Sequence, residues 1–523
     1  MAKFSNYNSP TNRGILGSVD ATPTALTHEG ALGYTRTPKA ELFLQAVTEM
    51  AENKFYETAE QRQTRLAKNV KIVLGEPDGW AWICDLVAWL RKEAGMRSAS
   101  IMIAAEAVAC LKGRSEPVNN GLSPRDLVAV ACQRADEPAE FLGYWIQNKG
   151  RKLPAPVKRG IADAAVRLYN EYTALKYDGQ SRSIRMADVI ELTHPKPKDA
   201  TQSALFKYLV DNRHNRDEFN LSDLPKIALD KHLLSLPTGE RMEAFQAGLP
   251  AQAGWSWERV SGWIPGGLTD AVWEGIIPTM GYMATLRNLR NFDQAGVSPG
   301  VKKLVNEKLA DPEQVAKSLQ FPYRFLSAWS NTESLDWASS LEAAANLSVK
   351  NIPEFEGRTL VVIDTSGSMQ SPVGGERSKI QCVDAAALFG YALALRNVGR
   401  VDLVMFADSS ATLTAPSKGA SLLRSVTNFR KQVGKVGYST QTWAAIKKHY
   451  NGHDRIIVLT DEQSHDRGKN PGCFMHFFNL AGYRVSTAPK DSRTFAYGGF
   501  TDQMFSTIPL LERGIAQRWP WEK

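Results

Sequence analysis

Cysteine is scarce in this sequence and does not occur in pairs. The chain of 523 residues has 5 cysteines, at positions 84, 110, 132, 382 and 473, and none of them forms a Cys-x-x-Cys motif. An odd number of scattered cysteines argues against a disulfide framework and suits reduced thiols. The pattern predicts a cytoplasmic protein.

Long hydrophobic runs are also missing. Residues 1–10 lack the apolar stretch of a signal peptide, and the most apolar segments, Trp80 to Leu90 and Ser100 to Leu111, are too short for a bilayer and contain Asp85 and Glu106. Hydrophobic residues make up 43% of the chain and charged residues 23%, which is typical of folded domains. We therefore expect a folded protein without a membrane segment.

The first two thirds of the chain have a helical pattern. From about Pro38 to Leu347, apolar residues recur at helical spacing in blocks separated by Gly, Pro and Asn, without a repeat of fixed length. Such blocks with short connections predict stacked antiparallel helix pairs, as in an α-solenoid. The individual helices are expected at Lys39 to Ala51, Gly79 to Glu93, Ser98 to Lys112, Pro138 to Asn148 and Ala155 to Tyr177, with another that Ser123 caps and Pro124 begins.

The pattern changes near Asn351. Short apolar runs at residues 359–364, 401–406 and 455–460 are typical of buried strands. Strands that alternate with helices predict a parallel, doubly wound sheet that is covered on both faces. The helices of this part are expected at residues 378–396, 422–433, 442–450 and 503–513.

Oxygen-bearing side chains follow two of these strands. Asp364, Ser366 and Ser368 come directly after the first strand, Asp461 ends another, and Thr440 precedes a helix. Ligands of open α/β sheets bind at the carboxyl ends of the strands. Hydroxyls with few carboxylates suit an octahedral cation such as Mg²⁺ or Mn²⁺ whose coordination water completes. The alternative is that these side chains only cap the next helix and close the loop.

The order Asp-x-Ser-x-Ser, loop Thr and strand-end Asp resembles the metal-ion-dependent adhesion site (MIDAS) of von Willebrand factor A domains. The resemblance implies metal contacts from Asp364, Ser366, Ser368, Thr440 and Asp461. Related domains usually carry Gly-Gly-Thr before the helix, whereas this chain has Tyr438-Ser439-Thr440, a stiffer loop. In such sites a carboxylate of a partner completes the coordination, and no nucleophile and base lie together in the sequence, so binding is expected and not catalysis.

Positive charge is concentrated in one segment. The chain has a net charge of +8, and the segment from Lys149 to Arg216 alone contributes +7. Tyr169, Tyr172, Tyr177 and Tyr208 are interleaved with these cations. Lys and Arg neutralise phosphates and aromatic faces stack on unpaired bases, so the combination favours RNA or single strands over duplex DNA. On charge alone, a solvated helix face is an equal alternative.

Five short motifs occur in an order that resembles the TROVE module. They are residues 30–34, residues 153–159 leading to 168–170, residues 192–197, residues 205–208 and residues 280–289. TROVE joined to a C-terminal von Willebrand A domain is the architecture of Ro proteins. The resemblance divides the chain into an N-terminal segment (1–29), a TROVE module of HEAT-like helical repeats (30–350) and an A-type domain (351–523).

The Ro resemblance implies a closed helical ring and a monomeric, non-enzymatic RNA-binding protein. Such a protein holds small structured Y-type RNA on a basic outer surface and admits misfolded or 3′-tailed non-coding RNA into a central hole, in RNA quality control. A 3′-to-5′ exoribonuclease is a further partner of some relatives. The competing interpretation is a metal-dependent protein adhesion or scaffold module with no specific RNA role.

The RNA-binding candidates come from two sources. By motif position, Lys176 and His194 match family residues tied to RNA binding, and Pro195 is expected to end the helix at His194. Arg287 and Asn288 could equally hold a contact between repeats. The charge pattern and the motifs together give this set of candidates: Lys149, Arg151, Lys152, Lys158, Arg159, Lys176, Arg185, His194, Lys196, Lys207 and Arg287.

Overall fold

The chain forms two compact units in a computed structural model. One, called here the helical unit, contains residues 37–269 and 519–523, and the other, the mixed unit, contains residues 1–36 and 270–518. No helix among the described residues is both long and apolar enough to cross a membrane. The structure describes residues 25–26, 32–33, 37–47, 59–111, 121–216, 219–332, 334–373, 378–461, 464, 466, 468–480, 493–498, 504–515 and 519–522.

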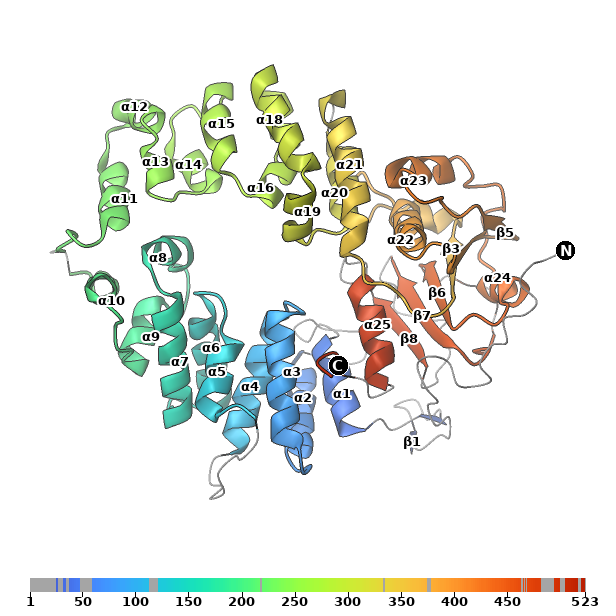
Figure 1. Ribbon diagram of the computed structural model, residues 1–523, viewed down its shortest axis with the longest axis horizontal. Helices are drawn as coiled ribbons and strands as arrows, with labels where there is room; N and C mark the ends of the chain where they lie inside the picture. The colour runs from blue at the N-terminus through green and yellow to red at the C-terminus, as the bar shows by residue number, and fades with distance from the viewer. Residues whose placement is uncertain are drawn as a thin grey trace. The chain divides into compact units, whose positions relative to one another are not determined.

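The helical unit is built from α-helices that pack against their neighbours along the chain. Helix α3 packs on α4 and α5, and α5 packs on α7, so these helices lie side by side (Figure 1). This arrangement agrees with the predicted stack of helices. The helices are α1 (Pro38–Val47), α2 (Ala59–Val73), α3 (Gly79–Lys92), α4 (Arg97–Cys110), α5 (Pro124–Ala131), α6 (Glu137–Lys149), α7 (Ala155–Leu168), α8 (Glu171–Tyr177), α9 (Met186–Thr193), α10 (Ala200–Arg213), α11 (Pro225–Ser235), α12 (Arg241–Gln246), α13 (Leu249–Gln252) and α14 (Trp257–Trp263).

The predicted helix boundaries hold at one cap and fail at another. The Ser123 hydroxyl accepts a hydrogen bond from the Asp126 amide at 3.2 Å, which confirms the predicted start of α5. The single helix expected from Ala155 to Tyr177 is wrong, because Asn170 caps a new helix there. The Asn170 side chain accepts from the Thr173 amide at 3.0 Å, and the Thr173 hydroxyl accepts from the Asn170 amide at 3.0 Å. Lys158 and Lys176 therefore lie on two different helices, α7 and α8.

The last residues of the chain complete the core of the helical unit. Trp519 is only 7% exposed. Its ring centroid lies 5.5 Å from that of Phe43 in α1 and 5.0 Å from that of Trp82 in α3. Trp521 stacks on Trp519 at 5.9 Å. Residues 519–523 thus differ from the expectation, which placed them in the A-type domain, because their aromatic rings fill a gap between α1 and α3.

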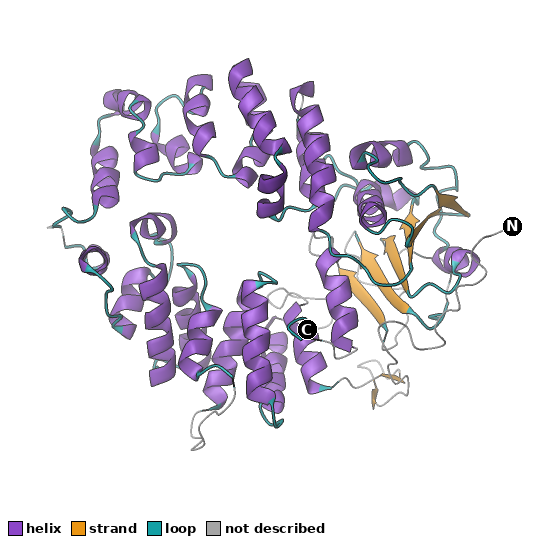
Figure 2. Cartoon of the chain, viewed as in Figure 1, coloured by secondary structure: helices purple, strands orange, loops and turns teal. Residues whose placement is uncertain are grey.

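The mixed unit contains a six-stranded sheet with the strand order β5-β4-β3-β6-β7-β8. All neighbouring strands are parallel except β4 and β5, which confirms the predicted doubly wound sheet and adds an antiparallel edge strand (Figure 2). The strands are β3 (Thr359–Asp364), β4 (Val401–Phe406), β5 (Ser410–Leu413), β6 (Arg455–Thr460), β7 (Phe474–Asn479) and β8 (Thr494–Gly498), and a separate antiparallel pair is formed by β1 (Ala25–Leu26) and β2 (Leu32–Gly33).

Helices cover both faces of this sheet. Gly390 of α22 lies so close to β3 that an added Cβ would be 2.9 Å from Ile363 Cδ1. On the other face, Trp443 of α24 packs on Phe477 of β7 at 5.9 Å. The helices of the mixed unit are α15 (Asp270–Ile276), α16 (Tyr282–Arg287), α17 (Leu289–Ala295), α18 (Pro299–Ala310), α19 (Pro312–Ser318), α20 (Pro322–Asn331), α21 (Ala338–Ser348), α22 (Cys382–Arg396), α23 (Leu422–Arg430), α24 (Thr442–His449) and α25 (Met504–Ile515).

Helix α25 is fixed to the sheet by a buried charged cluster. The carboxylate of Glu512 accepts a hydrogen bond from Arg455 Nε at 2.6 Å and lies 2.9 Å from His476 Nε2. All three side chains are fully buried. A buried charge needs such partners, because its loss of hydration would otherwise be costly. The cluster therefore ties the C-terminal helix to β6 and β7.

The helices before residue 351 pack with the sheet domain. The Asn346 side chain of α21 accepts a hydrogen bond from the Leu422 amide at 2.9 Å, and Phe321 packs on Phe505 of α25 at 5.7 Å. Residues 270–350 consequently belong to the same compact unit as the sheet. The expected boundary between residues 350 and 351 lies inside this unit, because side chains on both sides of it share one core.

Candidate metal centre and nucleic-acid interface

The predicted metal ligands gather at the carboxyl ends of β3 and β6. These strands pair in parallel with Ile363 opposite Leu459, so Asp364 at the end of β3 and Asp461 directly after β6 lie on adjacent strands. Both carboxylates are fully buried. One oxygen of Asp364 accepts from the Ser366 amide at 2.8 Å, and the other accepts from the Thr460 hydroxyl at 2.6 Å. The strand register thus places two carboxylates at one edge of the sheet.

Hydroxyl groups complete the donor set. Ser366 Oγ and Ser368 Oγ lie 3.2 Å apart in the loop after β3, and Thr440 is 3% exposed in the loop before α24. Burial raises the pKa of Asp364 to about 7, and the negative charge of Asp461 adds to this effect. A divalent cation would remove the unfavourable burial of two like charges. All donors are oxygen atoms, which is the ligand type that Mg²⁺ and Mn²⁺ prefer, so the residues fit such an ion.

Other metal chemistries find less support. Among the described residues, no three His, Cys, Asp or Glu side chains come together in a group that could hold a metal. All five cysteines are thiols, and burial raises the pKa of Cys382 to about 11. A thiol with a raised pKa is a poor nucleophile and a poor metal ligand at neutral pH. The candidate centre is therefore of the hydroxyl-rich type.

The loop that carries Thr440 is shaped by a glycine and an aspartate that sequence reasoning missed. Gly437 has φ = 95°, and a Cβ at this position would lie 1.8 Å from Asp408 Oδ2. The same oxygen accepts a hydrogen bond from the Tyr438 amide at 2.8 Å. The Gln441 amide donates to the Ala407 carbonyl at 3.0 Å, which fixes the loop to the end of β4. The tight turn at Gly437 thus precedes Tyr438-Ser439-Thr440, and Tyr438 is left 62% exposed.

Most of the RNA-binding candidates in the helical unit are exposed. Lys158 is half-buried and lies on α7 beside the exposed Arg159, and Lys176 on α8 is exposed. Lys149 is exposed, but its ammonium group pairs with Glu106 at 2.7 Å. The remaining exposed candidates of this unit are Arg151, Lys152, His194, Lys196 and Lys207.

Arg185 requires a correction. Its side chain is only 9% exposed, and its guanidinium group pairs with Asp178 at 2.5 Å. The Arg185 amide also donates to Asp188 at 2.8 Å, at the start of α9. A buried arginine with these partners holds α8 and α9 together and has no free face for a phosphate.

His194 ends α9 as predicted. Its amide donates to the Ile190 carbonyl at 2.8 Å, and its backbone has the left-handed conformation with φ = 49°. Residues other than glycine rarely adopt this conformation. The exposed imidazole therefore stands at a helix end directly before Pro195.

A cluster of cations and tyrosines surrounds Lys176. The Lys176 ammonium group lies 5.5 Å from the ring centroid of Tyr172 and 5.3 Å from that of Tyr177. Lys226 of α11 lies 6.0 Å from the Tyr172 ring, and the Arg134 guanidinium group lies 5.3 Å from the Tyr177 ring. Arg134 and Lys226 were missed because they lie outside the basic segment of the sequence. We call these five residues the Lys176 cluster.

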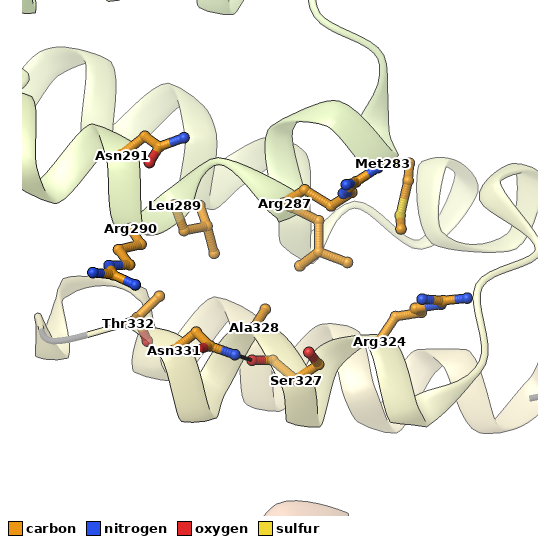
Figure 3. Close-up of a pocket in the computed structure, with 11 residues that line it drawn as sticks. Met283, Arg287, Leu289, Arg290, Asn291, Arg324, Ser327, Ala328, Asn331 and Thr332 are labelled. Carbon is orange, nitrogen blue, oxygen red and sulfur yellow. Dashed lines mark hydrogen bonds between the residues drawn. The ribbon is translucent and has the colours of Figure 1, made fainter. Parts of the chain in front are cut away.

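The structure separates the roles of Arg287 and Asn288 in the mixed unit. Asn288 is 2% exposed, donates to the Ala284 carbonyl at 2.8 Å and accepts from the Asn291 side chain at 2.7 Å. Arg287 is exposed and lines a cavity of about 540 Å³ between α16, α17 and α20 (Figure 3). Asn288 thus has a structural role, whereas Arg287 is available to a ligand.

Comparisons with known proteins find a TROVE match that contains one of the five motifs, residues 280–289. Residues 253–351 match the TROVE domain. The crystal structure of the Ro (RSR) protein of Deinococcus radiodurans has the same fold, with a TM-score of 0.60 and 18% identity over 97% of this chain and 98% of that chain. Telomerase protein component 1 of Mus musculus is 38% identical over 68 residues, which is 13% of this chain and 3% of that protein. The TROVE match covers residues 253–351 of this chain, and the likeness to the Ro protein shows that the two chains share a fold.

Proposed function

We propose that this protein is a non-catalytic RNA-binding protein of RNA quality control in the cytoplasm. It holds small structured RNA of the Y type on the basic surface of the helical unit and captures misfolded or 3′-tailed non-coding RNA through a central hole. The observation that carries the proposal is a set of cations on α7, α8 and α10 and in the loop before α10 that have no acidic partner among the described residues: Lys158, Arg159, Lys176, Lys196 and Lys207.

The neighbouring acids are already paired with other arginines. Asp163 pairs with Arg125 at 2.5 Å, Asp188 with Arg213 at 3.1 Å and Asp211 with Arg216 at 2.8 Å. A helix face that only needed solubility would carry both signs interspersed. The surplus cations from α7 to α10 instead favour a polyanion, since each phosphate contact releases counterions from the nucleic acid.

The tyrosines of the Lys176 cluster favour RNA over duplex DNA. Tyr172 is 42% exposed, and its ring lies beside Lys176 and Lys226. Exposed aromatic rings stack on unpaired bases, and cations beside them bind the backbone. Loops and tails of structured RNA present such bases, whereas a DNA duplex keeps them inside.

We further propose that the candidate metal centre binds Mg²⁺ or Mn²⁺ and serves a protein partner. Asp364 and Asp461 would hold the ion with Ser366, Ser368 and Thr440. A bound ion would offer a Lewis-acidic contact to a carboxylate of the partner, for which a 3′-to-5′ exoribonuclease is one candidate. The exposed side chain of Tyr438 beside this loop favours a protein contact, which keeps the adhesion or scaffold interpretation as the second candidate function.

Tailed hairpins should bind more tightly than blunt ones. A single-stranded tail can contact cations and aromatic rings that an A-form duplex cannot reach. In a competition series at fixed salt, affinity should rise with the length of a 3′ overhang until the tail fills its site. Matched 5′-tailed hairpins serve as the control and should gain less. Equal affinity for blunt, 5′-tailed and 3′-tailed hairpins would refute capture by the 3′ end.

A further inference from the structure

We propose that the cavity between α16, α17 and α20 is a second RNA site that takes a short unpaired segment. The proposal rests on the RNA-binding function and adds a site formed by residues of the mixed unit, outside the basic segment of the sequence. The cavity has a volume of about 540 Å³, within the range of pockets that hold small ligands. All of its lining residues belong to the mixed unit.

The cavity is lined by three arginines and by no acidic residue. Arg287 ends α16, Arg290 lies in the first turn of α17 and Arg324 lies in α20. Arg287 and Arg290 are exposed, and neither has an acidic partner in the described part of the chain. Arginine binds phosphate with two parallel hydrogen bonds. A concave site with such a surplus of arginine selects an anion.

The break between α16 and α17 gives the arginines their positions. Asn288 ends one helix and begins the other, and its buried side chain bonds to the Ala284 carbonyl at 2.8 Å. The break places Arg287 on one side of Asn288 and Arg290 on the other. Figure 3 shows Arg290 at one end of the cavity and Arg324 at the opposite end, with Leu289 between them. Cations at both ends suit an extended anion better than a single small ion.

The wall between the arginines suits a nucleobase. Met283 and Ala328 line the cavity, are only partly buried and offer apolar surface for the face of a base. The Asn331 amide nitrogen donates to the Ser327 carbonyl at 2.8 Å, which leaves its carbonyl oxygen to accept from a base. In a single strand, each base lies between two phosphate groups along the chain. A cavity with arginines at both ends and an apolar wall between them matches this order. A duplex is too wide to enter a cavity between helices and keeps its bases paired.

The test compares two variants that lose the same charge from the same unit. Arg287→Gln/Arg290→Gln removes two cavity cations, and Lys303→Gln/Lys317→Gln removes two lysines that are 79% and 78% exposed and lie outside the cavity. Binding of a labelled hexauridylate and of a blunt hairpin is measured by fluorescence anisotropy over a salt series. The cavity variant should bind hexauridylate at least about tenfold more weakly, with a salt slope smaller by about 1.4, because each single-strand phosphate contact contributes about 0.7.

The blunt hairpin and the lysine variant supply the controls. Hairpin affinity should stay within about twofold in the cavity variant, and the lysine variant should bind both probes nearly as well as the wild type. A second variant, Ala328→Asp, keeps the arginines and adds a carboxylate to the cavity, and it should lose hexauridylate binding as well.

Four results would overturn the site. They are equal losses in the cavity and lysine variants, equal losses for hexauridylate and hairpin, unchanged hexauridylate binding in both cavity variants, or displacement of hexauridylate by an equally charged acidic peptide. In each case hairpin binding by the wild type would leave the proposed RNA-binding function standing. A wild-type protein that binds neither probe would refute that function itself.

Discussion

Reversal of three cations on α7 and α8 should lower the affinity for structured RNA at least about a hundredfold at 0.15 M salt. The variant is Lys158→Glu/Arg159→Glu/Lys176→Glu. Each change removes a phosphate contact and adds a charge that repels the backbone, and Lys176→Glu also breaks the Lys176 cluster. A plot of log K against log salt should lose about 2 units of slope, since each contact contributes about 0.7 to 0.9. The measurement is filter binding or anisotropy over a salt series.

The matched control reverses three cations elsewhere in the helical unit. Lys68 and Lys71 on α2 and Lys92 on α3 are exposed and lie outside the basic segment. Lys68→Glu/Lys71→Glu/Lys92→Glu carries the same charge change and should weaken binding by less than about tenfold, since only screened long-range attraction is lost. Equal losses in the two triple variants would show that net charge, and not the α7 to α10 face, binds RNA.

Replacement of Asp364 should abolish uptake of the divalent cation and leave RNA affinity nearly unchanged. In the wild type, a cation at about a hundred times its Kd should stabilise the mixed unit by about 2.7 kcal/mol and raise its Tm by about 4 to 5 °C. Asp364→Ala removes one of two carboxylate ligands, so this shift should disappear. Calorimetric titration with Mg²⁺ or Mn²⁺ and thermal melts provide the measurements.

A carboxylate at the amino ends of the parallel strands, opposite to the candidate metal centre, is the control for this prediction. Asp402 lies at the start of β4 and pairs with His453 at 2.8 Å. Asp402→Asn should retain the cation-dependent rise in Tm. Retention of that rise in Asp364→Ala would place the cation elsewhere. Cation-dependent RNA cleavage that Asp364→Ala removes would contradict the non-catalytic function.

The buried strands were predictable because their sequences are nearly continuous apolar runs. Strands β3, β4 and β6 have the predicted bounds, and each is buried along almost its whole length. Strand β7 (Phe-Met-His-Phe-Phe-Asn) contains a buried histidine, and β5 is a short edge strand of polar composition, so neither has that pattern. Edge strands and strands with buried charges depend on tertiary partners, here Glu512 for His476.

Long-range packing set the features that the sequence could not predict. The aromatic contacts of Trp519 are with Phe43 and Trp82, more than 400 residues earlier in the chain. The helix break at Asn170 was missed because apolar spacing continues across it, while the decisive signal was the local pair of Asn170 and Thr173. A local cap can end a helix at a point where the apolar periodicity continues, so the periodicity alone does not show whether the helix ends there.

The candidate site was predictable where it depended on local motifs and not where it depended on packing. The Asp-x-Ser-x-Ser motif and the strand-end Asp461 lie at one sheet edge, as parallel strands require. Tertiary packing brings Asp408 to the loop that carries Thr440 and Arg324 to the cavity, and no local motif indicates either position. Charge counting included Arg185, although this arginine is buried against Asp178, because a count of charges does not report burial.

The most direct test of the central claim is the nucleic acid that purifies with the full-length protein. The absorbance ratio at 260 and 280 nm is measured before and after a high-salt wash, and the released nucleic acid is treated with ribonuclease and sequenced. If the protein binds RNA as proposed, the ratio should be high before the wash and fall after it, and the released RNA should contain small structured species and transcripts with unpaired 3′ tails. A ratio typical of pure protein before the wash, together with recovery of a protein partner that depends on Mg²⁺ or Mn²⁺, would contradict RNA binding and favour the adhesion module.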